Sequence, residues 1–288
     1  MKRTLTLCVV ALLMAALPSS ATDSATLDQA LAAYDDRDID KTIKLLNELA
    51  AEDDKAALMN LAKVEMRTGS PKKGLKATER LVKIYPNDPD VHHAHGMASL
   101  SMMSEVSVFR FVSMAKQAKA GWEKAVELDP EHLDGLYALF SYYANAPKVG
   151  GGDIEEARRL QARLASINDG YGHLALGVLH AKEERYEAAE AAFVESAQNM
   201  NTAGAYFALA QFYLDREKFS EALEAIANFP VKPADFWDPD PPVQFLVIAI
   251  AQSGLGNPGA AETAINSGLA MKPGKRLREF FEEVQKQL

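Results

Sequence analysis

The sequence is poor in cysteine: Cys8 is the only one among 288 residues. A chain with one thiol cannot build a disulfide framework. Cys8 lies inside the apolar run from Leu5 to Leu17, and Leu7 precedes it where a lipoprotein signal would have a small residue. We therefore expect neither a disulfide fold nor a lipid attached at Cys8.

Long apolar runs are also scarce, and the run from Leu5 to Leu17 is the main one. It follows Lys2 and Arg3 and is followed by the small residues Ser19-Ser20-Ala21, a pattern typical of a cleaved signal peptide. The run is too short to anchor the chain across a bilayer. We predict a signal peptide over residues 1–21, export to the periplasm or beyond, and no stable membrane span after cleavage.

Positive charge is sparse, with 31 Lys and Arg against 40 Asp and Glu and a net charge of −9. The densest basic stretch runs only from Lys275 to Arg278. Such a balance argues against nucleic acid and against anionic membrane surfaces as partners.

Catalytic signatures are missing as well. The sequence contains no HExxH motif and no Gly-x-Ser-x-Gly turn. Gly150-Gly151-Gly152 is not followed by the Lys and Ser/Thr of a P-loop. Asp153 and Glu156 instead predict an N-cap with a capping box, which makes the glycines a connector between helices. We expect no enzyme, no catalytic residue and no cofactor.

What the sequence does contain is a repeat. Small residues recur at spacings of 32 to 44 positions, in most units with an apolar residue four positions later. A period near 34 is typical of stacked helix–turn–helix units, in which a small residue lets two helices cross closely. The recurring positions are Thr42, Gly74, Ala118, Ala157, Ala189, Ala222 and Ala261.

The fullest units carry further matching residues. In one of them Leu176 and Gly177 are followed by Tyr186, Ala189 and Phe193, and other units repeat this order. The pattern resembles the tetratricopeptide repeat family over nearly the whole mature chain, and the stretch from 107 to 157 resembles an exported bacterial subgroup. The resemblance implies an all-α solenoid, a right-handed superhelix of about seven units. The units span 27–54, 55–88, 90–131, 133–169, 170–201, 203–230 and 242–273, and a capping helix spans 274–288.

Two units carry insertions. The third has about ten extra residues before Trp122, and no Pro or Gly occurs between Met97 and Ala120, which predicts lengthened helices without a loop. The fourth contains APKVGGGD. Two more segments have features of contact surfaces: the one around Phe236 and Trp237, and the amphipathic C-terminal helix with Leu277, Phe280, Phe281 and Val284 on one face.

In tetratricopeptide stacks the first helix of each unit lines a concave groove that meets the ligand. The resemblance implies a groove that is largely apolar and contains several methionines, which favours an amphipathic helix or extended peptide as partner. The alternative is that neighbouring units bury these residues. The positions are Met59, Lys63, Met66, His93, Met97, Tyr137, Ser141, Leu174, Val178, Phe207, Gln211, Leu214, Leu246 and Ile250.

The predicted function is that of an exported interaction scaffold or adaptor in the envelope of a Gram-negative bacterium. A second hypothesis is a periplasmic metal-binding protein, because His92 and His95 lie three residues apart and face one side of a helix. Their alternative role is as partly buried core histidines, with His93 facing the groove, and on that interpretation there is no metal site. A third hypothesis is a subunit that scaffolds a catalytic partner.

Overall fold

The computed structural model describes residues 20–103, 105–230 and 238–288, without the side chains of residues 20–23, 108 and 109. Nearly all of the predicted signal peptide and the pair Phe236 and Trp237 lie outside the described residues. Where the chain is described it is helical, without a strand.

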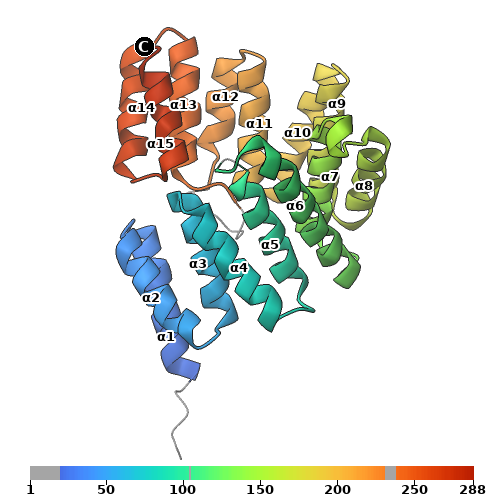
Figure 1. Ribbon diagram of the computed structural model, residues 1–288. Helices are drawn as coiled ribbons and strands as arrows, with labels where there is room; N and C mark the ends of the chain where they lie inside the picture. The colour runs from blue at the N-terminus through green and yellow to red at the C-terminus, as the bar shows by residue number, and fades with distance from the viewer. Residues whose placement is uncertain (1–19, 104, 231–237) are drawn as a thin grey trace, which may run out of the picture.

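Fifteen α-helices follow one another along the described residues, joined mostly by short turns (Figure 1). They are α1 (Ser20–Asp35), α2 (Ile39–Ala51), α3 (Lys55–Thr68), α4 (Pro71–Ile84), α5 (Pro89–Met102), α6 (Val108–Leu128), α7 (Leu133–Asn145), α8 (Ile154–Ile167), α9 (Asp169–Lys182), α10 (Tyr186–Met200), α11 (Ala203–Asp215), α12 (Phe219–Ala227), α13 (Pro242–Gly254), α14 (Pro258–Ala270) and α15 (Lys275–Gln285), with a 3₁₀ turn η1 (Lys148–Gly150) after α7.

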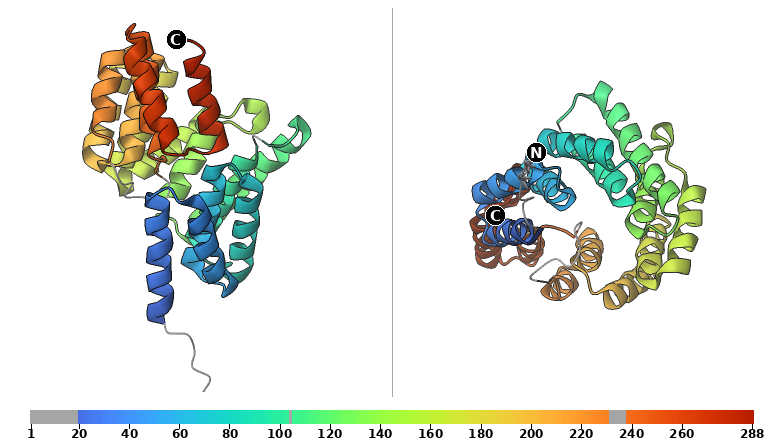
Figure 2. Two further views of the ribbon diagram at one scale, coloured as in Figure 1. Left: turned by 90° about the vertical axis from the view of Figure 1, so that its left-hand side faces the viewer. Right: turned by 90° about the horizontal axis from the view of Figure 1, so that it is seen from below.

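Each odd-numbered helix from α1 to α13 packs against the helix that follows it, and each hairpin packs against the next. The stack curves, so that in a view along its axis the helices form a ring in which the first and last hairpins overlap, and the side views show the last hairpin lying above the first (Figure 1, Figure 2). The predicted all-α solenoid is confirmed.

The seven small residues of the repeat lie where the two helices of a hairpin approach most closely. All seven are buried. At Gly74 a Cβ atom would come within 2.7 Å of the Met66 side chain and 2.9 Å of the Ala62 carbonyl oxygen. A larger side chain there would push α3 and α4 apart, which explains why the sequence shows the repeat most clearly at these positions.

Helix ends follow the usual capping chemistry. Asp54 accepts a hydrogen bond from the Ala57 N–H at the start of α3, and Asp88 accepts one from the Val91 N–H at the start of α5. Gly69 ends α3 with φ of +94°, a conformation that glycine adopts without strain.

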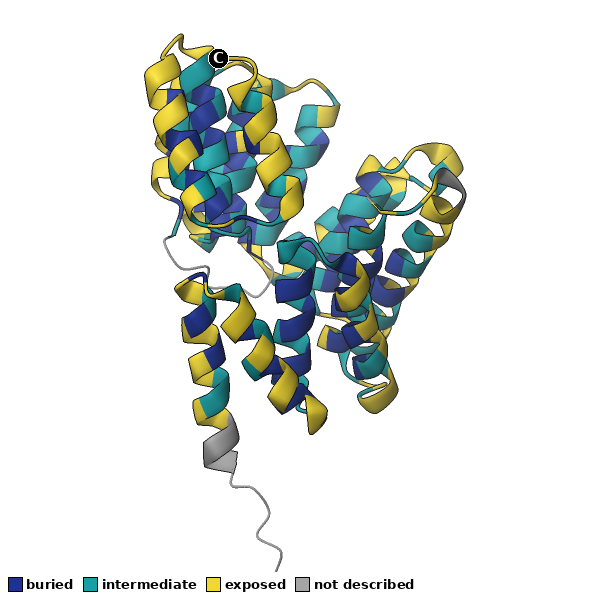
Figure 3. Cartoon of the chain, turned by 60° about the vertical axis from the view of Figure 1, so that its left-hand side comes forward, coloured by how far each residue is buried: buried dark blue, intermediate teal, exposed yellow. Residues whose placement is uncertain are grey.

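The buried apolar residues form four clusters along the stack and not one central core. The clusters are centred on Leu58, Phe140, Phe193 and Phe281. Buried residues lie on the faces where helices meet, and exposed residues lie on the outer faces (Figure 3). Each hairpin is therefore held mainly by its neighbours, as expected for a solenoid.

The insertion in the third unit lengthens one helix. α6 is 21 residues long, whereas α5 has 14. The expectation of lengthened helices is correct for α6, but the expectation that no loop interrupts them is wrong, because the chain leaves the helix after Met102 and starts α6 at Val108. A hairpin needs a reversal, and Ser107 in extended conformation supplies the start of α6 without Pro or Gly.

The two ends of the superhelix meet. Arg37, in the turn after α1, donates hydrogen bonds to both carboxylate oxygens of Asp240, at 3.1 and 3.0 Å, and the Tyr34 hydroxyl on α1 donates to the same carboxylate at 3.0 Å. Arg67 on α3 lies 3.8 Å from that carboxylate and donates to the Asp238 carbonyl oxygen. We call Tyr34, Arg37, Arg67, Asp238 and Asp240 the closure cluster. It joins the first two hairpins to the segment before α13.

The C-terminal helix takes part in the same closure. A Cβ atom at Gly274 would lie 1.7 Å from the Arg67 carbonyl oxygen, so the start of α15 packs directly on the end of α3. Phe281 on α15 is fully buried beneath Gly268, as the amphipathic pattern predicts. Phe280 was expected on the same apolar face but is exposed, with the Arg276 guanidinium 5.9 Å from its ring centroid.

Candidate functional site

A cavity of about 1050 Å³ opens between α5, α6 and α7, beside the turn that follows α7. We call it the α5–α7 cavity. Its wall consists of His93, Met97, Leu100, Met103, Phe111, Val112, Ala115, Lys116, Ala118, Lys119, Trp122, Asp134, Tyr137, Ala138, Ser141, Tyr142, Asn145, Ala146, Pro147, Lys148, Val149, Gly150 and Gly151.

Both insertions contribute to this cavity. The turns α5–α6 and α7–α8 each connect the first helix of a hairpin to the second, and in a stack of hairpins such turns lie along the same edge. The lengthened start of α6 contributes Phe111 and Val112, and the turn after α7 contributes Val149. Stacking therefore brings together two insertions that are separate in the sequence.

The mouth of the cavity is apolar and open to solvent. Leu100 is 42% exposed, Phe111 44%, Val112 53% and Val149 100%. These four are among only ten large apolar side chains exposed in the described part of the chain. Their gathering at one cavity distinguishes this place from the scattered apolar residues of an ordinary surface.

Aromatic rings form the deeper wall. Trp122 is buried and meets the Tyr142 ring edge-on, with centroids 6.4 Å apart. Gly96 makes room for it, since a Cβ atom there would lie 2.4 Å from the indole nitrogen. Burial raises the pKa of Tyr137 to about 12, against a smaller lowering by its hydrogen bond with Ser141. The Tyr137 phenol is therefore neutral at ordinary pH.

His93 closes one side of the cavity. Burial, reinforced by the nearby His132, lowers the pKa of His93 to about 3, although Asp90 acts in the opposite direction. The His93 and His132 ring centroids are 5.6 Å apart. A neutral imidazole at this depth keeps the wall uncharged.

Charge appears at the rim, and most of it is positive. Lys116 and Lys148 are exposed and form no ion pair within the described residues. Lys119 lies 4.9 Å from the centroid of the Tyr143 ring, and its pKa is raised, first by its hydrogen bond with Tyr143. Asp134 is the acidic wall residue, and it accepts a hydrogen bond from a tyrosine hydroxyl on α9 at 2.6 Å.

The glycine turn after α7 is held firmly. Gly151 has φ of +90°, and a Cβ atom at Gly152 would lie 1.8 Å from the Ala146 carbonyl oxygen. Asp153 accepts hydrogen bonds from two N–H groups at the start of α8, which confirms the predicted N-cap. The prediction of a full capping box is wrong, because the Glu156 side chain does not accept a hydrogen bond from the Asp153 N–H. That N–H donates to a backbone carbonyl on α7, and Glu156 binds Arg159. The glycines therefore shape the cavity wall as a fixed connector.

The structure brings four of the fourteen predicted groove residues together at the α5–α7 cavity: His93, Met97, Tyr137 and Ser141. Leu174 is 5% exposed and belongs to a core cluster that extends from α9 to α13, so it matches the alternative that neighbouring units bury these residues. The remainder lie elsewhere along the stack: Val178, Phe207 and Leu214 pack against that same cluster, Met59 and Leu246 against two others, Lys63, Met66 and Ile250 are partly buried, and Gln211 is exposed.

The histidines of α5 are occupied by hydrogen bonds. One ring nitrogen of His95 lies 3.1 Å from the Thr78 hydroxyl and the other lies 3.1 Å from the Gln117 side-chain nitrogen. His92 Nε2 lies 2.7 Å from the Pro86 carbonyl oxygen. Within the described part of the chain no cluster of three or more His, Cys, Asp or Glu is placed to hold a metal ion. These contacts match the alternative role of His92 and His95 as packing residues.

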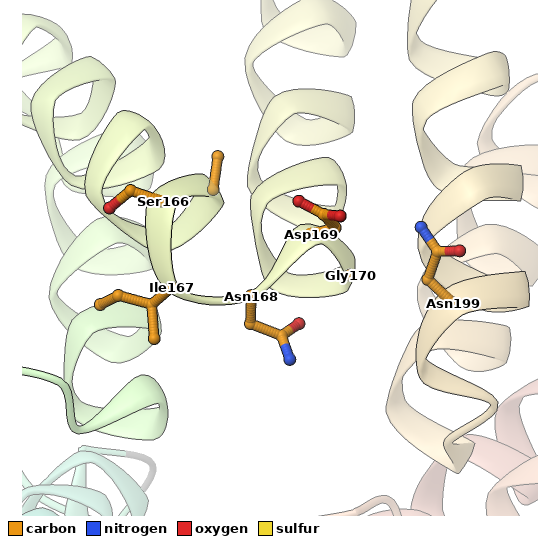
Figure 4. A pocket seen from close by; sticks show the side chains of 7 residues that line it. Ser166, Ile167, Asn168, Asp169, Gly170 and Asn199 are labelled. Atoms are coloured by element: carbon orange, nitrogen blue, oxygen red, sulfur yellow. The ribbon is translucent and has the colours of Figure 1, made fainter.

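A second hollow, of about 390 Å³, lies at the turn between α8 and α9 opposite Asn199 of α10 (Figure 4). Its wall is mostly polar backbone and small side chains around Asn168 and Asp169. The Asn168 side chain accepts a hydrogen bond from the Tyr171 N–H and so caps α9. Capping accounts for the Asn168 side chain in this hollow.

None of the described helices is long and apolar enough to cross a membrane.

The comparisons with known proteins define the class. No family model matches the chain, and no curated protein matches it. Among solved structures, a tetratricopeptide repeat protein from Parabacteroides merdae is similar, with 13% identity, a TM-score of 0.54, and coverage of 93% of this chain and 99% of the other.

Two larger assemblies also contain similar chains. One is the APC/C hetero-tetramer Cut9-Hcn1, with 15% identity, a TM-score of 0.52, and coverage of 88% of this chain and 47% of the other. The other is the human IFIT1 dimer with PPP-AAAA, with 16% identity, a TM-score of 0.52, and coverage of 87% and 55%. The chain therefore has the tetratricopeptide repeat fold, an all-α solenoid.

Sequence reasoning found the deeper wall of the cavity but missed its mouth. Phe111, Val112, Lys116 and Val149 are not groove positions of a regular unit, because they lie in the insertions. The signal that could have found them is the position of the insertions, since each follows the first helix of its unit.

Proposed function

We propose that this chain is an interaction scaffold that holds an apolar segment of a protein partner in the α5–α7 cavity. The observation that supports this proposal is the exposure of Leu100, Phe111, Val112 and Val149 around one apolar hollow. Covering each of these side chains with a partner removes apolar surface from water, at about 25 cal/mol for each Å². The proposal narrows the groove predicted from the sequence to the section formed by α5, α6 and α7.

A binding role is favoured over catalysis by the chemistry of the cavity wall. Its buried members are apolar or aromatic, its histidine is neutral, and its lysines lie at the rim. Such a wall offers contact area and orientation, whereas acid–base catalysis needs titratable groups that face each other inside a site.

We also propose that the scaffold works in the envelope of a Gram-negative bacterium after export. Support comes from the basic start, the apolar run and the small residues Ser19-Ser20-Ala21. The test is N-terminal sequencing of the protein recovered from a periplasmic extract. A mature chain beginning at Thr22 supports export, and a protein that keeps Met1 in the cytoplasmic fraction contradicts it.

The docking site itself is tested by photocrosslinking in cells that make the protein natively. A photoreactive amino acid replaces Val149 at the cavity mouth or, as control, Leu255 on the last hairpin, an apolar residue that is 42% exposed. We expect a discrete protein adduct from position 149, lost when Val112→Asp places a charge in the mouth. Equal adducts from both positions, or an adduct that survives Val112→Asp, would contradict the proposal.

A further inference from the structure

The geometry points to a partner segment that combines apolar side chains with carboxylates, and we infer that acidic amphipathic segments are the ligands of the α5–α7 cavity. This inference rests on the proposed function and specifies the chemistry of its partner. It follows from the sign of the charge at the rim, the size of the exposed mouth and the charge of the whole chain.

The rim is positive in a chain that is negative overall. The chain carries −9, with 31 basic and 40 acidic residues. The cavity wall carries three lysines and one aspartate, and that aspartate is already hydrogen-bonded. Lys116 and Lys148 have no ion-pair partner in the described chain. A carboxylate above the apolar mouth would give these two ammonium groups a counter-charge in a partly desolvated place, where the interaction is stronger than on an open surface.

The mouth argues for a protein segment and against a small amphiphile. A fatty acid held inside the cavity would leave Val149 and Val112 in water, because these side chains point to solvent at the entrance. A helix or extended segment can cover the entrance while its apolar side chains reach the aromatic wall. Met97 and Met103 add side chains that adapt to different apolar shapes.

The test uses two labelled helical peptides and the full-length protein. One peptide is amphipathic and built from leucine and glutamate, and the other has lysine at every glutamate position. Fluorescence anisotropy gives both affinities. The negative chain as a whole attracts the lysine peptide, so a preference for the glutamate peptide must come from a local site. We expect the glutamate peptide to bind about tenfold more tightly, and this preference to weaken as salt screens the lysines.

Charge reversal at the rim tests whether the lysines cause this preference, and charge reversal at two distant lysines is the matched control. Lys116→Glu with Lys148→Glu removes or reverses the preference, whereas Lys44→Glu with Lys83→Glu, at exposed lysines of α2 and α4, changes total charge equally and leaves the preference intact. All four positions are exposed, so circular dichroism should show unchanged helicity. A preference that persists in the Lys116/Lys148 variant overturns the inference.

The remaining outcomes separate this inference from the proposed function. Equal binding of both peptides that Val112→Asp abolishes overturns the acidic ligand but leaves the apolar docking site. Binding of dodecanoate with no binding of either peptide overturns the inference in favour of a small amphiphile. Dodecanoate binding is read from the emission of Trp122 in a Trp237→Phe background, because the chain has two tryptophans. Failure of the Val149 crosslink removes the proposed function whatever the peptides do.

Discussion

At the closure cluster, the Arg37 guanidinium, the Tyr34 hydroxyl and the Asp240 carboxylate, from opposite ends of the sequence, satisfy one another. At the α5–α7 cavity, large apolar side chains are exposed, and Lys116 and Lys148 have no ion-pair partner among the described residues. Both regions depart from a regular stack of hairpins. The closure cluster joins two distant segments of the chain, whereas the α5–α7 cavity leaves apolar side chains exposed in the described part of the chain.

The two regions differ in whether their side chains stabilise the fold or are left exposed by it. Buried charges are costly unless they are paired, so the closure cluster must be complete before the ring is stable. Exposed apolar side chains cost the folded chain little, because much of any protein surface is apolar. We therefore expect substitutions at the closure to change stability and shape, and substitutions at the cavity mouth to change binding.

The largest effect on stability should come from Asp240→Ala. The change leaves Arg37, which is largely buried, without its carboxylate, and breaking a buried ion pair from one side costs about 3 kcal/mol or more. Urea unfolding measures the loss, and small-angle scattering should show a wider particle as the two ends separate.

The control for Asp240→Ala is an ion pair on the surface. Asp53 binds Arg80 with both side chains well exposed, and Arg80→Ala should cost less than about 1 kcal/mol. If the two alanine variants lose equal stability, the closure cluster is no more than another surface pair.

A smaller loss is expected from Gly274→Ala, which disturbs the closure without changing charge. The added methyl group would lie 1.7 Å from the Arg67 carbonyl oxygen, so the start of α15 must move away from α3 at a cost of about 1–3 kcal/mol. Thermal or urea unfolding checks this value. Gly259→Ala on α14 is the matched control, because a Cβ atom there meets nothing within 4 Å, and it should be neutral or slightly stabilising.

The smallest effect on the free energy of unfolding at neutral pH is expected from His93 in the cavity wall. In acid the effect of His93 becomes clear. Its pKa is about 3 in the folded chain and about 6.5 when unfolded. Between these values the unfolded state binds more protons, so the His93 contribution to stability falls as pH falls, by at most about 1.4 kcal/mol per pH unit. His93→Gln should flatten the decline of the free energy of unfolding between pH 7 and 4. An identical pH slope in the variant contradicts a buried neutral His93.

Much of the fold could be predicted from local patterns. The small residues at Gly74 and Ala189 mark helix crossings because a crossing tolerates no larger side chain, and that constraint recurs in every unit. Asp153 is recognisable as a cap because capping involves residues only two or three positions apart. The groove positions were harder to assign: Leu174 is buried because α9 packs into the cluster that extends to α13, a contact that no single unit defines.

The sequence by itself determined that the chain folds into paired helices with small residues at their crossings, because helix formation, capping and close approach depend on residues within one unit. Only the tertiary structure decided that Arg37 and Asp240 meet, and that Val112 and Val149 border one cavity. The pitch and curvature of the stack are the sum of small rotations between successive hairpins. The sequence pattern of a single unit does not specify that sum. The same sum of rotations brings the closure cluster together and leaves the mouth of the α5–α7 cavity exposed within the described part of the chain.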